Sequence, residues 1–409
     1  MGNKKVCIIG LGYIGLPTAA LLANNGYEVS GVDVNVSVVE TINQGKVHIV
    51  EPELDDYVQS AISKGKLKAH LDAKPSDIYI ICVPTPFHEG KGVPQPNIDF
   101  VMRATQSILH LLKDDDLVIL ESTSPVGTTR KIGEVIKESG LDIKKVHIAY
   151  CPERVLPGKI IRELIENDRI VGGLTNQATK VASNFYRSFV QGDVFETDAP
   201  TAEMCKLTEN SFRDVNIAFA NEISLICSKE GINVWDLIEL ANRHPRVNVL
   251  QPGIGVGGHC IAVDPWFIVA QNPDNAKLIH KAREVNNYKT EWVLNQIKIE
   301  VNTLTAKIKK PQKIICLGLA FKPNIDDLRE SPAINIVNNL LSDGFDVSVV
   351  EPNITGHDKF KIITLESALK MDGIFIALVK HQEFLSVTTI KNLRKLQTLD
   401  FCGLFSQIN

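Results

Sequence analysis

The chain has 409 residues, a length that predicts two or three domains, because one domain usually holds roughly 100 to 200 residues. Apolar residues make up 44% and charged residues 22% of the sequence, a balance that excludes a disordered chain. The net charge of −4 offers no basic surface to a phosphate backbone, so we expect no nucleic-acid partner.

The uncharged stretch 6–23 could pass for a signal peptide or a membrane span. Three glycines and Pro17 interrupt it, and neither a cleavage site nor a stop-transfer cluster follows, so both alternatives are disfavoured. The eight cysteines are widely spaced and include no CxxC pair, which argues against a cysteine-based zinc site. We therefore expect a cytoplasmic protein with no membrane partner.

The first part of the chain predicts strands that alternate with helices. GLGYIG forms a tight turn after the first strand, and the helix 16–25 carries Pro17 in its first turn, where proline is tolerated. Strands are expected at 5–10, 27–33, 77–83, 117–121 and 146–150. This alternation predicts a doubly wound parallel sheet.

The period changes near residue 198, where about 30 residues without an interior Gly or Pro predict one long helix that connects domains. Further helices are expected at 234–242 and 276–305, and strands return at 313–317, 345–351 and 372–379. The fold class is therefore α/β, with two Rossmann-like doubly wound domains joined by a long central helix and a helical middle domain. The expected domains are 1–197, 198–308 and 309–409.

GLGYIG is a GxGxxG turn placed between a strand and a helix, and Asp33 ends the next strand. Gly10 permits the turn, Gly12 lets a diphosphate approach the backbone, and Gly15 lets the helix pack on the strand. A carboxylate at Asp33 would bind the ribose hydroxyls and repel a 2′-phosphate, which predicts NAD rather than NADP. The corresponding third-domain turn, GLAFKP, retains one of the three glycines, so we expect it to bind a different nucleotide.

Three other segments are candidates for chemistry. Thr85 and Thr123 follow predicted strands, at the sheet edge where ligands bind, although such loops are more often simple turns and caps. Lys206, Asn210 and Arg213 share one face of the long helix, as a polar track or as a solvated stripe. Cys260 follows four glycines in six residues and precedes Asp264, which suits a reactive thiolate as well as a buried structural cysteine.

Six ordered segments together resemble the UDP-glucose/GDP-mannose dehydrogenase family, up to about Pro352. They are GLGYIGLP, ESTSPVGTT, CPERVLPG, TAEMCKLTENSFRDVNIAFANE, NRHPRVNVLQPGIGVGGHCIAVDPWF and FKPNIDDLRESP. The resemblance implies a Rossmann domain for NAD, a helical middle that forms a homodimer, and a UDP-binding domain. It implies metal-free, four-electron oxidation of a UDP-N-acetylhexosamine at C6, with UDP-N-acetyl-D-mannosamine expected and UDP-N-acetylglucosamine as the alternative.

The resemblance also implies residue roles. The catalytic residues would be Cys260 as nucleophile, Lys206 as proton donor or acceptor, Asn210 and Asp264 as assisting groups, Glu153 in thioester hydrolysis, and Thr123, which orients water. Cofactor contacts would come from Gly10, Gly12, Tyr13, Ile14, Gly15, Asp33, Thr85, Thr123 and Arg329. Substrate contacts would come from Arg154, Val155, Lys206, Asn210, Arg213, His244, Arg246, Gly257, Phe321 and Lys322.

Two other functions remain open from sequence. A two-electron dehydrogenase of the 3-hydroxyacid type would share the first domain and a helical second domain, but it would not require Cys260. A catalytically silent nucleotide-sugar sensor would have no reason to combine Cys260, Lys206 and Glu153. The number of NADH formed per UDP-sugar, two, one or none, separates the three hypotheses.

Overall fold

The computed structural model describes residues 4–88, 90, 92–258 and 260–406. The chain forms two compact units, Met1–Glu209 and Asn210–Asn409. Helix α8 (Ala199–Glu230) contains the point at which the two units divide, and its 32 residues match the long helix that the sequence predicts. Among the described residues, we find no helix with the length and apolar character needed to cross a membrane.

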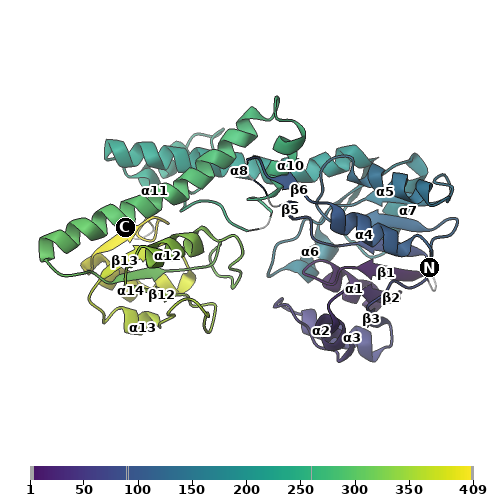
Figure 1. The fold of residues 1–409 in the computed structure, drawn as a ribbon, viewed down its shortest axis with the longest axis horizontal. Helices are drawn as coiled ribbons and strands as arrows, with labels where there is room; N and C mark the ends of the chain where they lie inside the picture. Colours follow the sequence, from purple (N-terminus) through teal and green to yellow (C-terminus); the bar gives the residue numbers. More distant parts are fainter. Residues whose placement is uncertain (1–3, 89, 91, 259, 407–409) are drawn as a thin grey trace. The chain divides into compact units, whose positions relative to one another are not determined.

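The first unit is built on an eight-stranded sheet in the order β3-β2-β1-β4-β7-β8-β9-β10. Figure 1 shows its strands β1, β2 and β3 next to one another. Its strands are β1 (Lys5–Ile9), β2 (Glu28–Val32), β3 (Leu67–His70), β4 (Ile78–Ile81), β7 (Leu117–Leu120), β8 (His147–Tyr150), β9 (Arg169–Gly173) and β10 (Val194–Asp198). β1 pairs with β2 on one side and β4 on the other, so the strand order reverses there. Ligands of doubly wound sheets bind at such a switch point, beyond the carboxyl ends of the strands.

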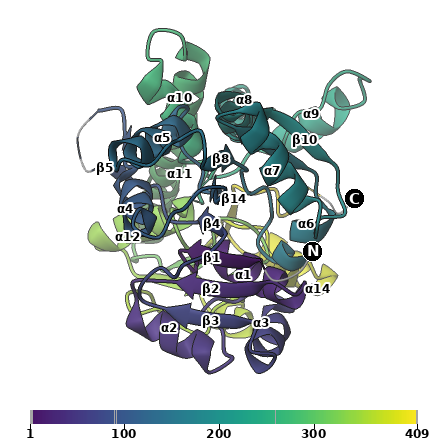
Figure 2. The ribbon, with the colours of Figure 1, turned by 90° about the vertical axis from the view of Figure 1, so that its right-hand side faces the viewer.

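Helices cover both faces of this sheet, which explains why its central strands are apolar throughout. They are α1 (Gly15–Asn24), α2 (Val36–Asn43), α3 (Leu54–Ser63), α4 (Asp99–Ile108), α5 (Thr128–Glu138), α6 (Ile160–Glu166) and α7 (Asn176–Tyr186). Figure 2 shows α4 and α5 on one side of the sheet and α1, α3, α6 and α7 on the other. A short antiparallel hairpin, β5 (Phe87–His88) with β6 (Gln95–Pro96), follows β4.

The second unit combines helices with a four-stranded parallel sheet in the order β12-β11-β13-β14. The helices are α9 (Val234–Ala241), α10 (Asp264–Gln271), α11 (Lys277–Ile308), α12 (Pro332–Ser342), α13 (Leu365–Ala368) and α14 (Val387–Lys395), with a 3-10 turn at Gln382–Phe384. The strands are β11 (Ile314–Leu317), β12 (Val347–Val350), β13 (Ile374–Ala377) and β14 (Thr398–Asp400). α11 and α12 pack on one face, and α13 and α14 pack on the other.

The structure confirms the predicted α/β class, and it adds the strands β3, β9, β10 and β14, which were not predicted from the sequence. β9 runs antiparallel to β8, so the first sheet is not parallel throughout. The glycine-rich stretch is followed at once by α10, whose first residues are Asp264 and Pro265. Proline pre-sets the backbone of a first helical turn, so this Asp-Pro pair is a helix start that the sequence analysis did not use.

Candidate active site

The glycine turn after β1 has the geometry of a dinucleotide cradle. Gly10 has φ +93°, and a Cβ there would lie 2.5 Å from the carbonyl oxygen of Cys82. A Cβ on Gly15 would lie 1.8 Å from the carbonyl oxygen of Gly10. A Cβ on Gly12 would meet nothing within 4 Å. Gly10 and Gly15 are therefore required by packing. Gly12 leaves open space before the start of α1, where a diphosphate could approach the backbone.

Asp33 lies directly after β2 and contacts this turn. Its Oδ2 accepts a hydrogen bond from the backbone N–H of Leu11 at 3.0 Å, and its Oδ1 accepts one from Asn35 at 2.9 Å. Each carboxylate oxygen has a further lone pair for a ribose hydroxyl. Tyr13 is half-buried against the first core and Ile14 precedes α1, so the predicted cofactor residues between Gly10 and Asp33 lie at or beside one turn.

The two predicted threonine loops meet at the switch point. Thr85 follows β4, and its hydroxyl donates to the carbonyl oxygen of Thr123, which follows β7, at 2.6 Å. Glu203 on α8 fixes the second loop, because its carboxylate accepts from the backbone N–H of Gly127 at 2.6 Å and of Thr129 at 2.7 Å. The sequence analysis missed Glu203, which caps the start of α5 from more than 70 residues away.

Glu153 and Arg154 follow β8, in the segment CPERVLPG. The Glu153 carboxylate accepts from Arg169 Nη1 at 2.9 Å and from the Arg154 backbone N–H at 2.6 Å. The Arg154 guanidinium makes a two-point ion pair with Glu209 on α8, with Nη2 to Oε1 at 2.8 Å. Val155 packs against the first core. The two predicted substrate contacts in this segment therefore also contact the protein itself: Arg154 pairs with Glu209, and Val155 packs on the first core.

Helix α8 presents the predicted polar track only in part. Lys206 and Asn210, one helical turn apart, are buried, but Arg213 is exposed. Within the second unit, the Asn210 amide donates a hydrogen bond to the carboxylate of Asp264 at the start of α10. The structure thus brings the side chains of Asn210 and Asp264 together, whereas Arg213 lies exposed and its role in substrate binding stays a prediction.

The loop that precedes Cys260 is held by buried polar groups of α8 and α11. Asn221 Oδ1 accepts from the backbone N–H of Gly253 at 2.9 Å, while its amide donates to Asn286. The Thr290 hydroxyl donates to the carbonyl oxygen of Ile254 at 2.8 Å. Neither Asn221 nor Thr290 stood out in the sequence, because the loop atoms that they hold are backbone atoms more than 30 residues away.

Cys260 is exposed, unlike a buried structural cysteine. Its carbonyl oxygen accepts from the backbone N–H of Asp264 at 2.8 Å, so the thiol lies one turn before α10. The preceding loop passes close to Phe321, since a Cβ on Gly258 would lie 2.8 Å from its ring and one on Gly257 would lie 2.8 Å from its Cβ. The exposure of the Cys260 thiol favours a reactive cysteine over a buried structural one.

The remaining predicted contacts belong to the second unit. Lys322, His244 and Arg246 are exposed, and the backbone N–H of Arg246 donates to His244 Nδ1 at 3.3 Å. Arg329 makes a two-point ion pair with Asp327, at 2.9 and 2.7 Å. The structure does not test the assignment of Arg329 to the cofactor.

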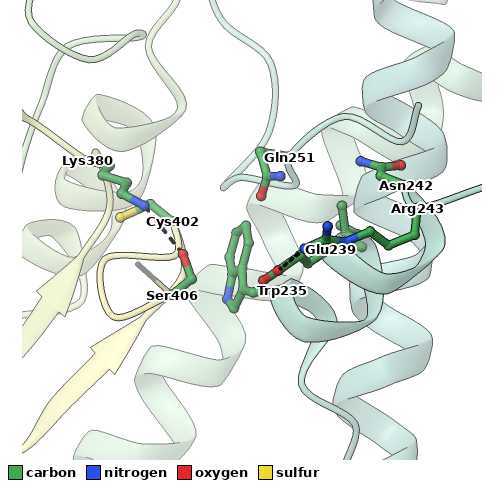
Figure 3. Close-up of a pocket in the computed structure, with 9 residues that line it drawn as sticks. Trp235, Glu239, Asn242, Arg243, Gln251, Lys380, Cys402 and Ser406 are labelled. Carbon is green, nitrogen blue, oxygen red and sulfur yellow. Dashed lines mark hydrogen bonds and ion pairs between the residues drawn. The ribbon is translucent and has the colours of Figure 1, made fainter. Parts of the chain in front are cut away.

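The second unit also contains a cavity of about 550 Å³ beside α9 (Figure 3). Trp235 of α9 lies between Glu239, on the same helix, and Ser406, in the loop after β14. Lys380 Nζ donates to the carbonyl oxygen of Gly403 at 2.6 Å, so this ammonium is already partly satisfied. The lining residues are Trp235, Ile238, Glu239, Asn242, Arg243, Gln251, Lys380, Cys402 and Ser406. The sequence analysis gave no indication of this cavity.

Models of one protein family match most of the chain. Models of the UDP-glucose/GDP-mannose dehydrogenase family match residues 4–190 as the NAD binding domain, 200–288 as the central domain and 315–405 as the UDP binding domain.

Two curated relatives and one solved structure are similar over nearly their full length. A UDP-N-acetyl-D-mannosamine dehydrogenase of Campylobacter jejuni is 52% identical over 405 residues, covering 95% of this chain and 98% of the relative. An NDP-N-acetyl-D-galactosaminuronic acid dehydrogenase of Ralstonia nicotianae is 49% identical, covering 98% and 96%. The structure of a UDP-D-ManNAc dehydrogenase from Pyrococcus horikoshii has a TM-score of 0.88 at 38% identity, covering 99% and 96%. The chain therefore belongs to the UDP-glucose/GDP-mannose dehydrogenase family.

Proposed function

We propose that the protein oxidises the C6 alcohol of UDP-N-acetyl-D-mannosamine to the carboxylate, with two NAD per sugar. The observation that carries this proposal is the exposed Cys260 thiol, at the end of a loop that Asn221 and Thr290 hold in place. A two-electron alcohol dehydrogenase needs a hydride acceptor and a base, but no sulfur nucleophile. The open space at Gly12 supports NAD as the cofactor.

The first oxidation requires the sugar hydroxyl to lose a proton as hydride leaves C6. Bound NAD supplies the hydride acceptor in both oxidations. We assign the proton transfer to Lys206, whose side chain is buried on α8. The fixed Asn210 amide, held by Asp264, would stabilise the developing oxyanion.

The second oxidation requires an alkoxide that the aldehyde itself does not have. Addition of the Cys260 thiolate to the aldehyde restores it as a thiohemiacetal, and loss of hydride then leaves a thioester on sulfur. Water hydrolyses this thioester, which releases the carboxylate and regenerates the thiol. We assign activation of that water to Glu153 and its orientation to Thr123.

The sugar is assigned from the relatives and from the segment His244-Pro245-Arg246 together with PERVLPG. The 52% identical relative is named for UDP-N-acetyl-D-mannosamine, whereas the 49% identical one is named for an NDP-N-acetyl-D-galactosaminuronic acid. A galactosamine substrate is therefore the second candidate. A panel of UDP-N-acetylhexosamines decides between them, and a higher kcat/KM for the galactosamine or glucosamine compound than for the mannosamine compound would reject the assignment.

The test of the reaction is the number of NADH formed per UDP-sugar consumed. We expect two NADH per sugar from the parent protein. In Cys260→Ala the rate of uronate formation should fall by several orders of magnitude, which is typical of a removed nucleophile. Cys402→Ala, in the cavity of the same unit, is the matched control and should still form two. One NADH per sugar from the parent protein would identify a two-electron dehydrogenase, and none would favour the sensor.

We further propose that the protein is a cytoplasmic homodimer. Phe212, Phe219 and Ile226 repeat every seven residues along α8 and are 68, 52 and 51% exposed. Such an apolar stripe on a long helix suits symmetric pairing with a second copy. Sedimentation should show a dimer that Phe219→Glu converts to monomer, and a parent protein that sediments as a monomer would refute the pairing.

We retain the division into three domains, 1–197, 198–308 and 309–409, as part of the proposal. The family matches change between residues 190 and 200 and again between 288 and 315, which supports these boundaries.

A further inference from the structure

A buried charge cluster lies behind Glu153, and the mechanism above does not use all of it. Arg169 opens β9 with a guanidinium that is only 2% exposed. Its Nη1 donates to Glu153 at 2.9 Å, and its Nη2 donates to the carbonyl oxygen of Leu164 at 3.0 Å. Its Cζ lies 5.6 Å from the centre of the Tyr186 ring, a distance that suits a cation–π contact.

A second carboxyl group, Glu121, lies in the same buried region, directly after β7 and 3% exposed. The Tyr186 hydroxyl donates to its Oε1 at 2.6 Å, and the Cys82 thiol lies 3.2 Å from its Oε2. The titratable groups that face Glu121 come from β4, β8, β9 and α7; they are Cys82, Cys151, Glu153, Arg169 and Tyr186.

This region contains one cation and two carboxyl groups, so both carboxyls cannot be ionised at low cost. Burial first, and then the charge of Glu153, raise the pKa of Glu121. Burial also raises the pKa values of Cys82 and Tyr186, and it raises that of Cys151 to about 12, so these groups stay neutral. Arg169 bonds directly to Glu153. The Tyr186 hydroxyl oxygen can accept a hydrogen bond from the O–H of a neutral Glu121, because a hydroxyl is both donor and acceptor.

We propose that Arg169 is a positioning residue that keeps Glu153 ionised and oriented for water activation, and that Glu121 carries the proton which leaves the charge of Arg169 to Glu153 alone. This proposal rests on the proposed function, in which Glu153 is the base that activates water. Of the two buried carboxyl groups, only Glu153 is hydrogen-bonded to the Arg169 cation, so Glu153 is the ionised group and Glu121 the neutral one.

The chemical consequence concerns thioester hydrolysis. A carboxylate can take a proton from water only in its ionised form, and a buried carboxyl without a cation favours its neutral form. Arg169 removes that penalty, and the backbone N–H of Arg154 fixes the other oxygen of Glu153. Ionisation of Glu121 would make a second anion compete for the same guanidinium.

The protonation of Glu121 is tested directly by infrared spectroscopy of the parent protein at neutral pH. We expect the carbonyl stretch of a protonated carboxylic acid, and we expect Glu121→Gln to remove it. Asp116→Asn changes another buried carboxyl, at the opposite end of β7, and should leave that band in place. A parent spectrum in which Glu121→Gln removes only carboxylate bands would overturn the proposal.

The role of Arg169 is tested by the pH profile of thioester hydrolysis, followed in single turnovers of the UDP-aldehyde with NAD. In Arg169→Gln we expect hydrolysis at neutral pH to fall about 10²-fold, the scale of a lost general base. It should recover as the pH rises, because Glu153 then ionises without its cation. Arg169→Lys keeps the charge and should keep the acid limb of the parent profile.

An acid limb that stays in place in a folded Arg169→Gln protein would overturn the positioning role and leave Arg169 a structural residue. If that variant does not fold, the infrared measurement and Arg169→Lys still decide. A failure of the proposed function would be distinct, because the parent protein would then form no Cys260 thioester, while the Glu121 band does not depend on any substrate.

Discussion

The two α/β units use the same turn after their first strand and then diverge. Gly10 and Gly318 have φ values of +93° and +96°, and their backbone N–H groups donate to the last residue of the next strand at 2.8 Å in both cases. A Cβ would collide at 2.5 Å at either position. The first glycine is thus required by the fold, whatever the unit binds.

The acid that follows the second strand shows the divergence. Asp33 is half-buried and accepts one backbone hydrogen bond from the turn. Glu351 is 3% exposed and accepts two, from Leu319 at 2.7 Å and Ala320 at 3.0 Å, and His381 Nε2 lies 3.0 Å from it. Burial alone would raise the pKa of Glu351, but His381 and these N–H groups lower it to about 2.

The comparison teaches that the strand–turn geometry and the ligand site are separable. Where the first unit has an open Gly12, the second has Ala320, which is buried. The Asp33 carboxylate keeps lone pairs that can accept hydrogen bonds from a ligand, whereas the Glu351 carboxylate accepts two hydrogen bonds from its own turn. Three substitutions test this difference between the two turns.

The largest effect is expected from Gly12→Val. A Cβ at this position meets no protein atom within 4 Å, so the new side chain should fill the space of the diphosphate rather than disturb the fold. We expect NAD affinity to fall at least about 10²-fold, a loss of roughly 2.7 kcal/mol, while the melting temperature stays near that of the parent. Gly356→Val, also in open space but in the second unit, is the control and should change neither property. Calorimetric titration with NAD measures the difference, and unaltered affinity in Gly12→Val would place the diphosphate elsewhere.

Glu351→Gln should act on stability alone. We expect a loss of about 2 kcal/mol in the free energy of unfolding, the scale of hydrogen bonds to a buried charged group, with NAD affinity unchanged. Because the pKa of Glu351 is lowered from 4.5 to about 2, its contribution is fully present above about pH 4.5 and is lost as the pH falls toward 2. Parent and variant should therefore converge at acid pH in urea unfolding, and a constant difference would contradict the ionised assignment.

Asp33→Asn should have the smallest effect. Loss of the carboxylate removes repulsion of a 2′-phosphate, so the preference for NAD over NADP should narrow by about tenfold, or about 1.4 kcal/mol. Its one turn hydrogen bond can be kept by the amide oxygen, so stability should change little. Steady-state kinetics with both cofactors give the ratio of kcat/KM for NAD to that for NADP. A parent protein that already used both equally well would contradict the assignment of Asp33 to the ribose.

Local sequence patterns predicted the parts of the molecule whose causes are local. The strand, GxGxxG turn and helix at residues 5–25 follow from spacing, because Gly10 and Gly15 are required by atoms of the βαβ unit itself or of the segment after the adjacent strand, whereas Gly12 faces open space. The long α8 follows from the absence of Gly and Pro. The exposure of Cys260 did not follow, because a loop's burial depends on what packs against it.

Contacts between distant segments were beyond the sequence analysis. Glu203 caps α5, and Asn221 holds Gly253, through backbone atoms that carry no sequence information. The antiparallel β9 was also missed, since its short run Arg169–Gly173 contains two glycines and opens with a charged residue. That residue is Arg169, which is buried only because Glu153 is there to pair with it.

We expect the first turn to bind NAD and the second turn not to bind it. Calorimetric titration of the parent protein with NAD, alone and with saturating UDP, tests it most directly. We predict one NAD per chain in both titrations and a separate site for one UDP per chain. Binding of two NAD per chain, or a loss of NAD sites when UDP is present, would contradict the account.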